Sequence, residues 1–192
     1  MSKTTVVIVH GSFGNIDENW IPYAVKQLSA DNCNVVVPQF PINSEQNFEN
    51  WKLTFFFFFG PLREDMILVG HSIASAFILA LLSESDIKLK GILLVSGFIN
   101  DLGISEFDTV NHSFTHFGFD WDKIVNSFEI GYSFHGIDDP YVPLWMGEEI
   151  ANKIDIELMP IENGGHLNTD AGFEEFPALL EDFAALHDDT SS

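Results

Sequence analysis

Three residue types that together catalyse acyl transfer lie at widely separated positions of this 192-residue sequence. Ser72 lies in the segment GHSIA, His166 in the segment NGGH, and the two acids Asp138 and Asp139 in the segment GIDDPYVP. A serine hydroxyl becomes nucleophilic when a histidine takes its proton, and a carboxylate on the other ring nitrogen holds that histidine in the required tautomer. The residue types therefore predict nucleophilic attack on an ester or amide carbonyl.

The residues next to Ser72 support this interpretation. In the pattern Gly-x-Ser-x-Gly the serine occupies a strained turn between a strand and a helix, where small neighbours are required. Gly70 meets that requirement, and Ala74 replaces the second glycine at the cost of one methyl group. The backbone N–H of Ile73, at the start of a helix, is then a candidate donor to an oxyanion. The alternative is that Ser72 merely caps a helix.

A second oxyanion donor is expected from the glycine-rich segment HGSFG, residues 10–14, which follows the first apolar run. We expect the backbone N–H of Ser12 to face the site, and Phe13 is the second choice. An ordinary glycine-rich turn is the alternative explanation of this segment.

The elements that must position these residues alternate regularly along the chain. Apolar runs at 5–10, 34–39, 65–70, 91–96, 129–135 and 155–161 read as strands, and the first four lack alternation, which is typical of parallel strands covered on both faces. Helical spacing occurs at 20–30, 48–58, 72–82, 144–153 and 173–186. This pattern predicts an α/β-hydrolase fold: a six-stranded, mostly parallel, doubly wound sheet with helices on both faces and strand order 2-1-3-4-5-6. Ser72, the two acids and His166 then follow three strand ends, where such sheets bind ligands.

Composition limits the partners. The chain is 46% hydrophobic, carries a net charge of −21 and has one cysteine. One domain, residues 1–192, accounts for this length, with a frayed tail at 187–192. The negative charge argues against nucleic acid or an anionic membrane surface as a partner. The lack of a signal peptide or a long apolar stretch predicts a cytoplasmic protein.

The sequence resembles the small serine hydrolases, the family that includes retinoblastoma-binding protein nine and the bacterial YdeN-type proteins. The resemblance covers most of the chain and is carried by VIVHGS, GHS, NDLG, WDKI, DDPYVP, GGH and two tryptophans at 20 and 51. It implies Ser72 as nucleophile, His166 as base and Asp139 as the orienting acid, because Asp139 matches the family pattern Asp-x-x-Val-Pro and Asp138 is one residue out of phase. It also implies a small ester or amide as substrate and no cofactor. A retinoblastoma-protein partner is not carried over.

Other aromatic residues have two explanations each. Phe13, His71, Trp20 and Trp121 are candidate pocket residues, although Trp20 is also expected to pack in the core and His71 to shape the turn. The segment 98–128 follows the fourth strand, where this fold often inserts a cap, and its phenylalanines together with Trp121 either line an acyl or aromatic pocket or form the core of the cap. Phe55 begins a run of five phenylalanines, residues 55–59, which cannot all face one side of a helix. Core packing explains most of them, and a homodimer contact is the alternative for the rest.

Three further alternatives concern a metal site, a binding role and the reaction itself. His112 and His116 have a spacing that could suit a metal, but surface histidines explain the pair better, so no metal is expected. The catalytic residues could also belong to a catalytically weak hydrolase fold that serves as a protein-binding module. Acyl transfer to an alcohol and thioester cleavage are related chemistries that the residues alone do not separate from ester or amide hydrolysis.

Overall fold

Six parallel strands form one sheet in the computed structural model, which describes residues 3–31 and 33–188, with side chains as far as residue 183. The order β2-β1-β3-β4-β5-β6 confirms the predicted one. The strands are β1 (Thr5–Val9), β2 (Asn34–Val36), β3 (Met66–His71), β4 (Leu89–Val95), β5 (Phe128–Gly136) and β6 (Glu157–Ile161). Every neighbouring pair runs parallel, which brings the carboxyl ends of all the strands to one edge.

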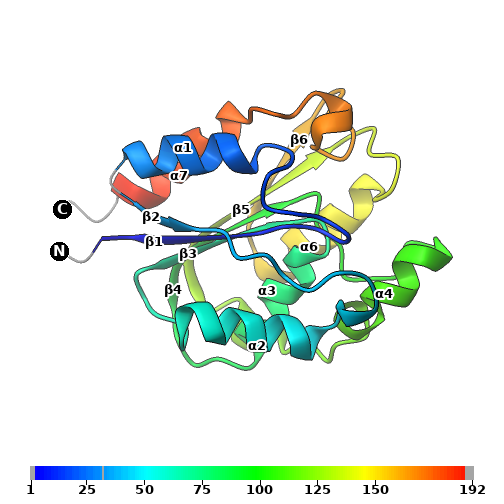
Figure 1. Ribbon diagram of the computed structural model, residues 1–192, viewed down its shortest axis with the longest axis horizontal. Coiled ribbons are helices and arrows are strands. Elements are labelled where there is room, and N and C mark those ends of the chain that lie inside the picture. The colour runs from blue at the N-terminus through cyan, green and yellow to red at the C-terminus, as the bar shows by residue number, and fades with distance from the viewer. Residues whose placement is uncertain (1–2, 32, 189–192) are drawn as a thin grey trace.

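Helices cover both faces of the sheet (Figure 1). On one face lie α1 (Ile21–Ala30) and α7 (Pro177–Asp188). On the other lie α2 (Phe48–Phe59), α3 (Ala74–Ser83), α4 (Ser105–Thr115), α5 (Trp121–Ile124) and α6 (Leu144–Ile154). Two short 3-10 helices, η1 (Asn43–Glu45) and η2 (Thr169–Ala171), lie in loops.

The burial of β1 explains why the central strands appear in the sequence as runs of apolar residues without alternation. Val6 and Ile8 pack into the core under α1 and α7, whereas Val7 and Val9 pack into the core on the α3 side. All four side chains are fully buried. Because successive residues of a strand point to opposite faces, a strand covered on both faces needs an apolar side chain at every position.

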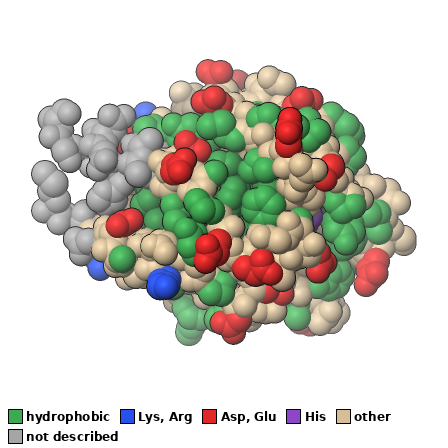
Figure 2. Space-filling view, turned by 90° about the horizontal axis from the view of Figure 1, so that it is seen from above, with side chains coloured by type: hydrophobic (Ala, Val, Ile, Leu, Met, Phe, Trp, Pro, Cys, Tyr) green, Lys and Arg blue, Asp and Glu red, His purple; other side chains and the backbone are tan. Residues whose placement is uncertain are grey.

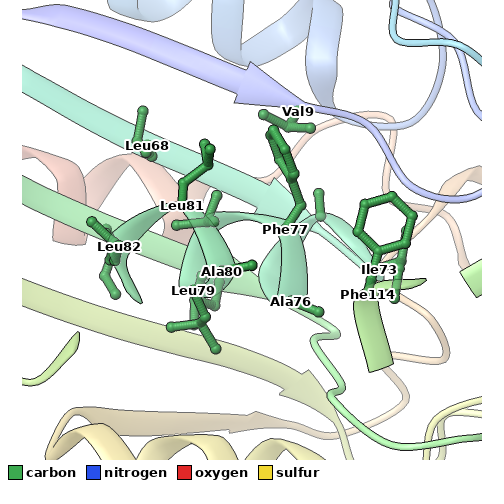
Figure 3. Packing of buried hydrophobic residues seen from close by; sticks show 14 of the residues in the cluster. Val9, Leu68, Ile73, Ala76, Phe77, Leu79, Ala80, Leu81, Leu82 and Phe114 are labelled. Atoms are coloured by element: carbon green, nitrogen blue, oxygen red, sulfur yellow. The ribbon is translucent and has the colours of Figure 1, made fainter. Parts of the chain in front are cut away.

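Helix α3 is the most deeply buried helix and carries the segment that follows Ser72. Its residues from Ala74 to Leu82 are all buried, so the helix has no polar face to the solvent there. Phe77 projects from α3, and the Phe114 ring lies nearby (Figure 3). Both belong to an aromatic cluster. The ring centroid of Phe77 lies 5.4–6.3 Å from the ring centroids of five other aromatic residues: Phe40, Phe48, Trp51, Phe55 and Phe114. This packing fixes the helix that begins at the candidate nucleophile.

The element boundaries differ from the predicted ones in a few places. Strand β2 ends at Val36, two residues before Pro38, which has no N–H to donate to a neighbouring strand. Helix α7 begins at Pro177 rather than at residue 173, since proline is favoured in the first turn of a helix. The helix includes residues 187 and 188 of the expected frayed tail, and residues 189–192 of that tail lie outside the described residues.

The segment 98–128 folds into α4 and α5. Phe114 and Ile124 from these helices are fully buried in the core on the α3 side. The segment therefore contributes to the main core, and its outer residues Leu102 and Phe107 reach the pocket described below. Its description as a cap, and the single-domain division of the chain, remain predictions.

The phenylalanine run occupies the last two turns of α2. Phe55 is fully buried, whereas Phe56, Phe57 and Phe58 are 38%, 83% and 54% exposed. Core packing therefore explains only Phe55 and, in part, Phe59, and the expectation that it explains most of the run is wrong, because only one side of α2 contacts the rest of the protein. Leu53, 68% exposed, extends the same apolar surface.

Acidic side chains are scattered over the face shown in Figure 2, with few lysine or arginine side chains between them. This distribution agrees with the net charge of −21. Within the described part of the chain, every helix is too short or too polar to cross a membrane.

Candidate active site

Ser72 occupies a sharp turn between β3 and α3. Its φ angle is +60°, in the left-handed region that residues with a side chain rarely adopt. The backbone N–H of Ser72 donates to the carbonyl oxygen of Val95, at 2.7 Å, which ties the turn to the end of β4. The turn places the serine side chain at the carboxyl edge of the sheet, and the main chain enters α3 directly afterwards.

Gly70 is required by the closeness of strand and helix at this turn. A Cβ atom on residue 70 would lie 2.9 Å from the carbonyl carbon of Ala74 and 2.8 Å from the Ile78 side chain. Residue 74 itself accepts a methyl group, since Ala74 is buried in the core without displacing the turn. The two small residues thus have unequal roles, and only the first needs to be glycine.

A hydrogen-bonded chain links three of the residues that the sequence singled out. The Nε2 atom of His166 lies 3.1 Å from the Oγ atom of Ser72. The Nδ1 atom of His166 lies 2.7 Å from the Oδ2 atom of Asp139. The structure therefore brings together Ser72, His166 and Asp139, which come from the loops after β3, β6 and β5.

Asp139 is held by backbone groups as well as by His166. Its Oδ1 atom accepts hydrogen bonds from the N–H groups of Tyr141, at 2.9 Å, and Val142, at 3.0 Å. Burial raises the pKa of Asp139, but the hydrogen bond and charge of His166, together with these two N–H groups, outweigh burial and lower the pKa below its ordinary value. The carboxylate is thus kept ionised beside the imidazole, where it favours an Nδ1–H tautomer.

Two supports hold the loop that carries His166. The Nε1–H of Trp20 donates to the carbonyl oxygen of Leu167, at 3.1 Å, and the Nε2 atom of His71 lies 3.0 Å from the carbonyl oxygen of His166. Gly136 at the end of β5 lets the loop come close, because a Cβ atom there would overlap the carbonyl oxygen of Gly165. The glycines of the GGH segment therefore bring the histidine against the acid-bearing loop.

His71 is a supporting residue rather than a proton carrier. Burial, followed by the nearby His166, lowers the pKa of His71 to about 3. The ring is therefore neutral, and its Nε2–H donates to the His166 carbonyl oxygen. It also forms part of the wall of the pocket described below.

The loop of residues 10–14 lies beside Ser72, and a Cβ atom on Gly11 would be 3.0 Å from that of Ser72. The N–H of Phe13 donates to the Oε1 atom of Gln46, at 3.2 Å. This bond engages the Phe13 N–H with an acceptor of the protein itself, and Ser12 remains the preferred prediction for the second oxyanion donor. Ile73, directly after Ser72, is fully buried, so its N–H lies in a site shielded from water.

A pocket of about 440 Å³ opens over Ser72 and His166. Leu102, Phe107, Tyr141 and Val142 provide apolar lining, and Glu18, Asn19, Asn168, Thr169 and Asp170 provide polar lining. The ring of Tyr141 lies 5.4 Å from that of His166 and 6.0 Å from that of Phe107. An aromatic wall thus runs outward from the candidate base.

The other predicted pocket residues lie elsewhere. Trp20 is fully buried beneath the His166 loop, and Trp121 contacts the Phe119 ring and the Lys153 ammonium group and packs against the core on the α3 side. Phe13 lines a separate, more open cavity of about 1060 Å³ beside α2 and contacts the Phe107 ring at 5.7 Å. For the two tryptophans, core packing replaces the pocket role.

Sequence reasoning missed Leu102 and Tyr141, whereas Phe107 is one of the phenylalanines of segment 98–128 that the sequence offers as pocket lining. Tyr141 lies within the DDPYVP segment, so its position two residues after the acid was a usable signal. Leu102 and Phe107 belong to a segment without clear periodicity, and only the tertiary structure places them over Ser72.

His112 and His116 stack on each other with ring centroids 4.0 Å apart. The side chains described contain no group of three or more histidines, cysteines or acids that could hold a metal ion.

Comparison with known proteins gives a consistent result. A family model described as "Serine hydrolase" matches residues 6–185. The protein YdeN of Bacillus subtilis (strain 168) is 30% identical over 178 residues, which cover 92% of each chain. The serine hydrolase RBBP9 of Rattus norvegicus is 27% identical over 160 residues, 83% of this chain and 80% of that protein.

Solved structures share the fold. The crystal structure of the ydeN gene product from Bacillus subtilis superposes with a TM-score of 0.89 at 29% identity, covering 97% of this chain and 99% of that one. The α/β hydrolase domain-containing protein 10 from mouse has a TM-score of 0.68 at 13% identity, covering 97% of this chain and 89% of that one. The architecture is therefore the α/β-hydrolase fold.

Proposed function

This chain belongs to the serine hydrolase family, and from that premise we propose that it cleaves a small ester or amide through an acyl-enzyme formed on Ser72. The observation that carries the proposal is the chain of two hydrogen bonds, Ser72 to His166 at 3.1 Å and His166 to Asp139 at 2.7 Å. A serine, a histidine and a carboxylate in this arrangement supply nucleophile, base and orienting acid.

In the first half of the reaction the Ser72 Oγ atom attacks the carbonyl carbon while His166 Nε2 takes the hydroxyl proton. The Asp139 carboxylate stabilises the imidazolium that forms. The N–H groups of Ile73 and Ser12 donate to the oxyanion of the tetrahedral intermediate. Collapse of the intermediate breaks the bond to the leaving group, which departs as an alcohol or amine with the proton from His166.

The second half repeats these steps with water. His166 Nε2 takes a proton from a water molecule as its oxygen attacks the acyl carbon on Ser72. The new tetrahedral intermediate collapses, the bond from the carbon to Oγ breaks, and the proton returns from His166 to Ser72. A carboxylic acid leaves, and the enzyme is restored. No cofactor takes part in this scheme.

The pocket supports a small substrate with an apolar part. Its volume of about 440 Å³ lies within the range of small-molecule sites. An acyl or alkyl group would contact Leu102 and Phe107, and the reacting carbonyl would lie at Ser72. A cytoplasmic location, and the absence of nucleic-acid partners, remain predictions from composition and charge.

A fluorophosphonate probe tests the proposal, since it reacts with activated serines. We expect the probe to label the wild type at one site and to leave Ser72→Ala unlabelled. Ser96→Ala is the matched control, because Ser96 is buried at the neighbouring strand end and its Oγ atom has no hydrogen-bond partner in the described structure. Equal labelling of wild type and Ser72→Ala would overturn the assignment.

Hydrolysis of short p-nitrophenyl esters completes the test. Turnover that is lost in Ser72→Ala supports an esterase. A wild type that neither reacts with the probe nor turns over these esters would instead support the binding-module alternative.

We also propose that the exposed surface of Leu53, Phe56, Phe57 and Phe58 contacts a second copy of this chain. Its support is the exposure of four large apolar side chains on one helix, which soluble monomers usually limit. The oligomeric state of a variant at Phe57 tests it, as described in the Discussion.

A further inference from the structure

A buried polar cluster lies behind the loop that carries Ser12. Its members are Ser12, Gln46 and Asn111. Ser12 lies in the loop after β1, Gln46 directly follows η1, and Asn111 lies in the middle of α4. Gln46 is 4% exposed and Asn111 1% exposed, so both amides are enclosed in the protein. Buried amides are costly unless they are hydrogen-bonded, and their partners therefore show what they hold in place.

The hydrogen bonds form a closed ring. The Nε2 group of Gln46 donates to Ser12 Oγ, at 3.1 Å, and to Asn111 Oδ1, at 2.7 Å. The Ser12 hydroxyl donates to the same Asn111 oxygen, at 2.7 Å. The three side chains thus bind one another, although their positions span 99 residues of the chain.

One backbone group fixes the direction of every bond in this ring. The Phe13 N–H donates to Gln46 Oε1, at 3.2 Å, so this end of the amide is its oxygen. The Gln46 nitrogen must then face Ser12 and Asn111, and Asn111 must present its oxygen to both. The Asn111 Nδ2 group is left with no hydrogen-bond partner among the described residues.

The cluster determines which N–H of the loop is available to a substrate. Gln46 engages Phe13, whose backbone has a φ angle of +57°, and the Ser12 hydroxyl is anchored to Asn111. Ser12 itself lines the pocket over Ser72. Gln46 and Asn111 do not line this pocket, so both hold the loop from outside it.

We propose that Gln46 and Asn111 are positioning residues that hold the Ser12 N–H in place to stabilise the oxyanion. The inference rests on the proposed function, because it concerns the transition state of that reaction. Neither amide touches the substrate, and each acts through Ser12. An oxyanion donor that is fixed in advance stabilises developing charge without reorganising during the reaction.

The test compares two substitutions at Asn111. Asn111→Leu removes the acceptor for both Ser12 and Gln46, whereas Asn111→Asp retains it and replaces only the Nδ2 group that has no partner. We expect Asn111→Leu to lower kcat about 10- to 100-fold with KM little changed, since loss of a complete oxyanion donor costs about 10²–10³. Asn111→Asp should recover most of that loss.

A tetrahedral inhibitor gives a second readout. Phenylboronic acid bonds to the Ser72 Oγ atom and places an oxygen where the oxyanion forms. Its inhibition constant should weaken in Asn111→Leu by about the same factor as kcat, because both depend on the transition-state geometry. A merely structural defect would instead lower the fraction of active enzyme and leave the inhibition constant unchanged.

Two further variants complete the design. Ser113→Ala is the matched control: Ser113 lies on α4 two residues from Asn111 and accepts a hydrogen bond from the Phe48 N–H, at 2.9 Å, outside the ring. It should keep the wild-type kcat. If Asn111→Leu does not fold, Ser12→Ala breaks the same tether while retaining the Ser12 N–H, and it should show the same loss in kcat.

An active wild type with unchanged kcat and boronate affinity in Asn111→Leu, or in Ser12→Ala where the former does not fold, would overturn the positioning role alone. A wild type that neither hydrolyses esters nor reacts with the fluorophosphonate probe would overturn the proposed function and this inference together. The two failures are therefore distinguishable.

Discussion

Asp138 and Asp139 are adjacent in the chain but bind different parts of the same histidine-bearing loop. Asp139 Oδ2 lies 2.7 Å from the Nδ1 atom of His166, whereas Asp138 Oδ1 accepts a hydrogen bond from the Gly165 N–H, at 3.0 Å. One acid faces the imidazole and the other faces the backbone beside it. The pair therefore offers a comparison in which charge and sequence position are nearly the same, whereas the Asp139 carboxylate is buried and Asp138 is exposed.

Substitution of each acid by asparagine should separate these roles. Asp139→Asn should lower kcat for a p-nitrophenyl ester by about 10³–10⁴, because an amide favours the wrong imidazole tautomer and cannot stabilise the imidazolium. Asp138→Asn keeps an oxygen that accepts from Gly165 and should have little effect. Steady-state kinetics of the two variants checks this, and equal losses would contradict the assignment of Asp139.

Three buried histidines should make the folded state sensitive to mild acid. Burial lowers the pKa values of His10, His71 and His135, that of His71 to about 3. Their ordinary pKa is 6.5, so below pH 6.5 the unfolded chain binds protons that the folded protein does not. The free energy of unfolding should thus be highest above pH 6.5 and fall towards pH 5, by up to about 1.4 kcal/mol per pH unit for each histidine.

Urea unfolding at several pH values between 7.5 and about 5, above the range where most carboxylates titrate, measures this slope. His135→Gln should reduce it, and His112→Gln, which changes an exposed residue, should leave it unaltered. Identical slopes in wild type and His135→Gln would contradict the interpretation for this histidine.

The aromatic cluster around Phe77 should dominate the stability of the α3 side of the core. Phe77→Ala removes a fully buried ring with five aromatic neighbours, and it should lower the free energy of unfolding by about 3–5 kcal/mol. Phe57→Ala, at an 83% exposed position, should change it by less than about 0.5 kcal/mol when unfolding is measured below the concentration at which dimers form. Chemical denaturation of both variants tests the contrast, which similar losses would refute.

The exposed end of α2 leads to a prediction about self-association. We expect the wild type to sediment as a dimer at micromolar concentration and Phe57→Ser to sediment as a monomer, since Phe57 is the most exposed ring of the surface. Val125→Ser removes an apolar side chain that is exposed on a different part of the molecule and serves as the control. A wild type that stays monomeric throughout the concentration range would exclude the dimer.

The sheet and its carboxyl edge could be predicted from the sequence because strands such as β1 and β3 consist mostly of apolar residues without alternation. Strands buried on both faces have this signature, and the end of β3 then gives the position of Ser72. Helix α4 gives only a weak hydrophobic pattern in the sequence, because only Asn111 and Phe114 are buried along its eleven residues. A helix with so narrow a buried stripe shows little periodicity.

The choice between the neighbouring acids depended on family resemblance, because spacing alone treats Asp138 and Asp139 alike. The coordinates distinguish them through a local turn, in which the N–H groups of Tyr141 and Val142 hold Asp139 Oδ1 and leave Oδ2 for His166. The position of Trp20 likewise depends on how α1 packs beneath the His166 loop. Such details arise from tertiary contacts and have no local sequence pattern.

Ser72, the proposed nucleophile, has a left-handed backbone conformation that lowers the stability of the folded protein. A residue with a side chain pays about 1–3 kcal/mol for that conformation, whereas glycine adopts it freely. A laboratory selection that rewarded thermal tolerance alone would therefore favour glycine at position 72 and enrich chains that melt later but have lost the hydroxyl. Engineering for thermal stability must therefore keep serine at position 72 and place the stabilising substitutions elsewhere in the molecule.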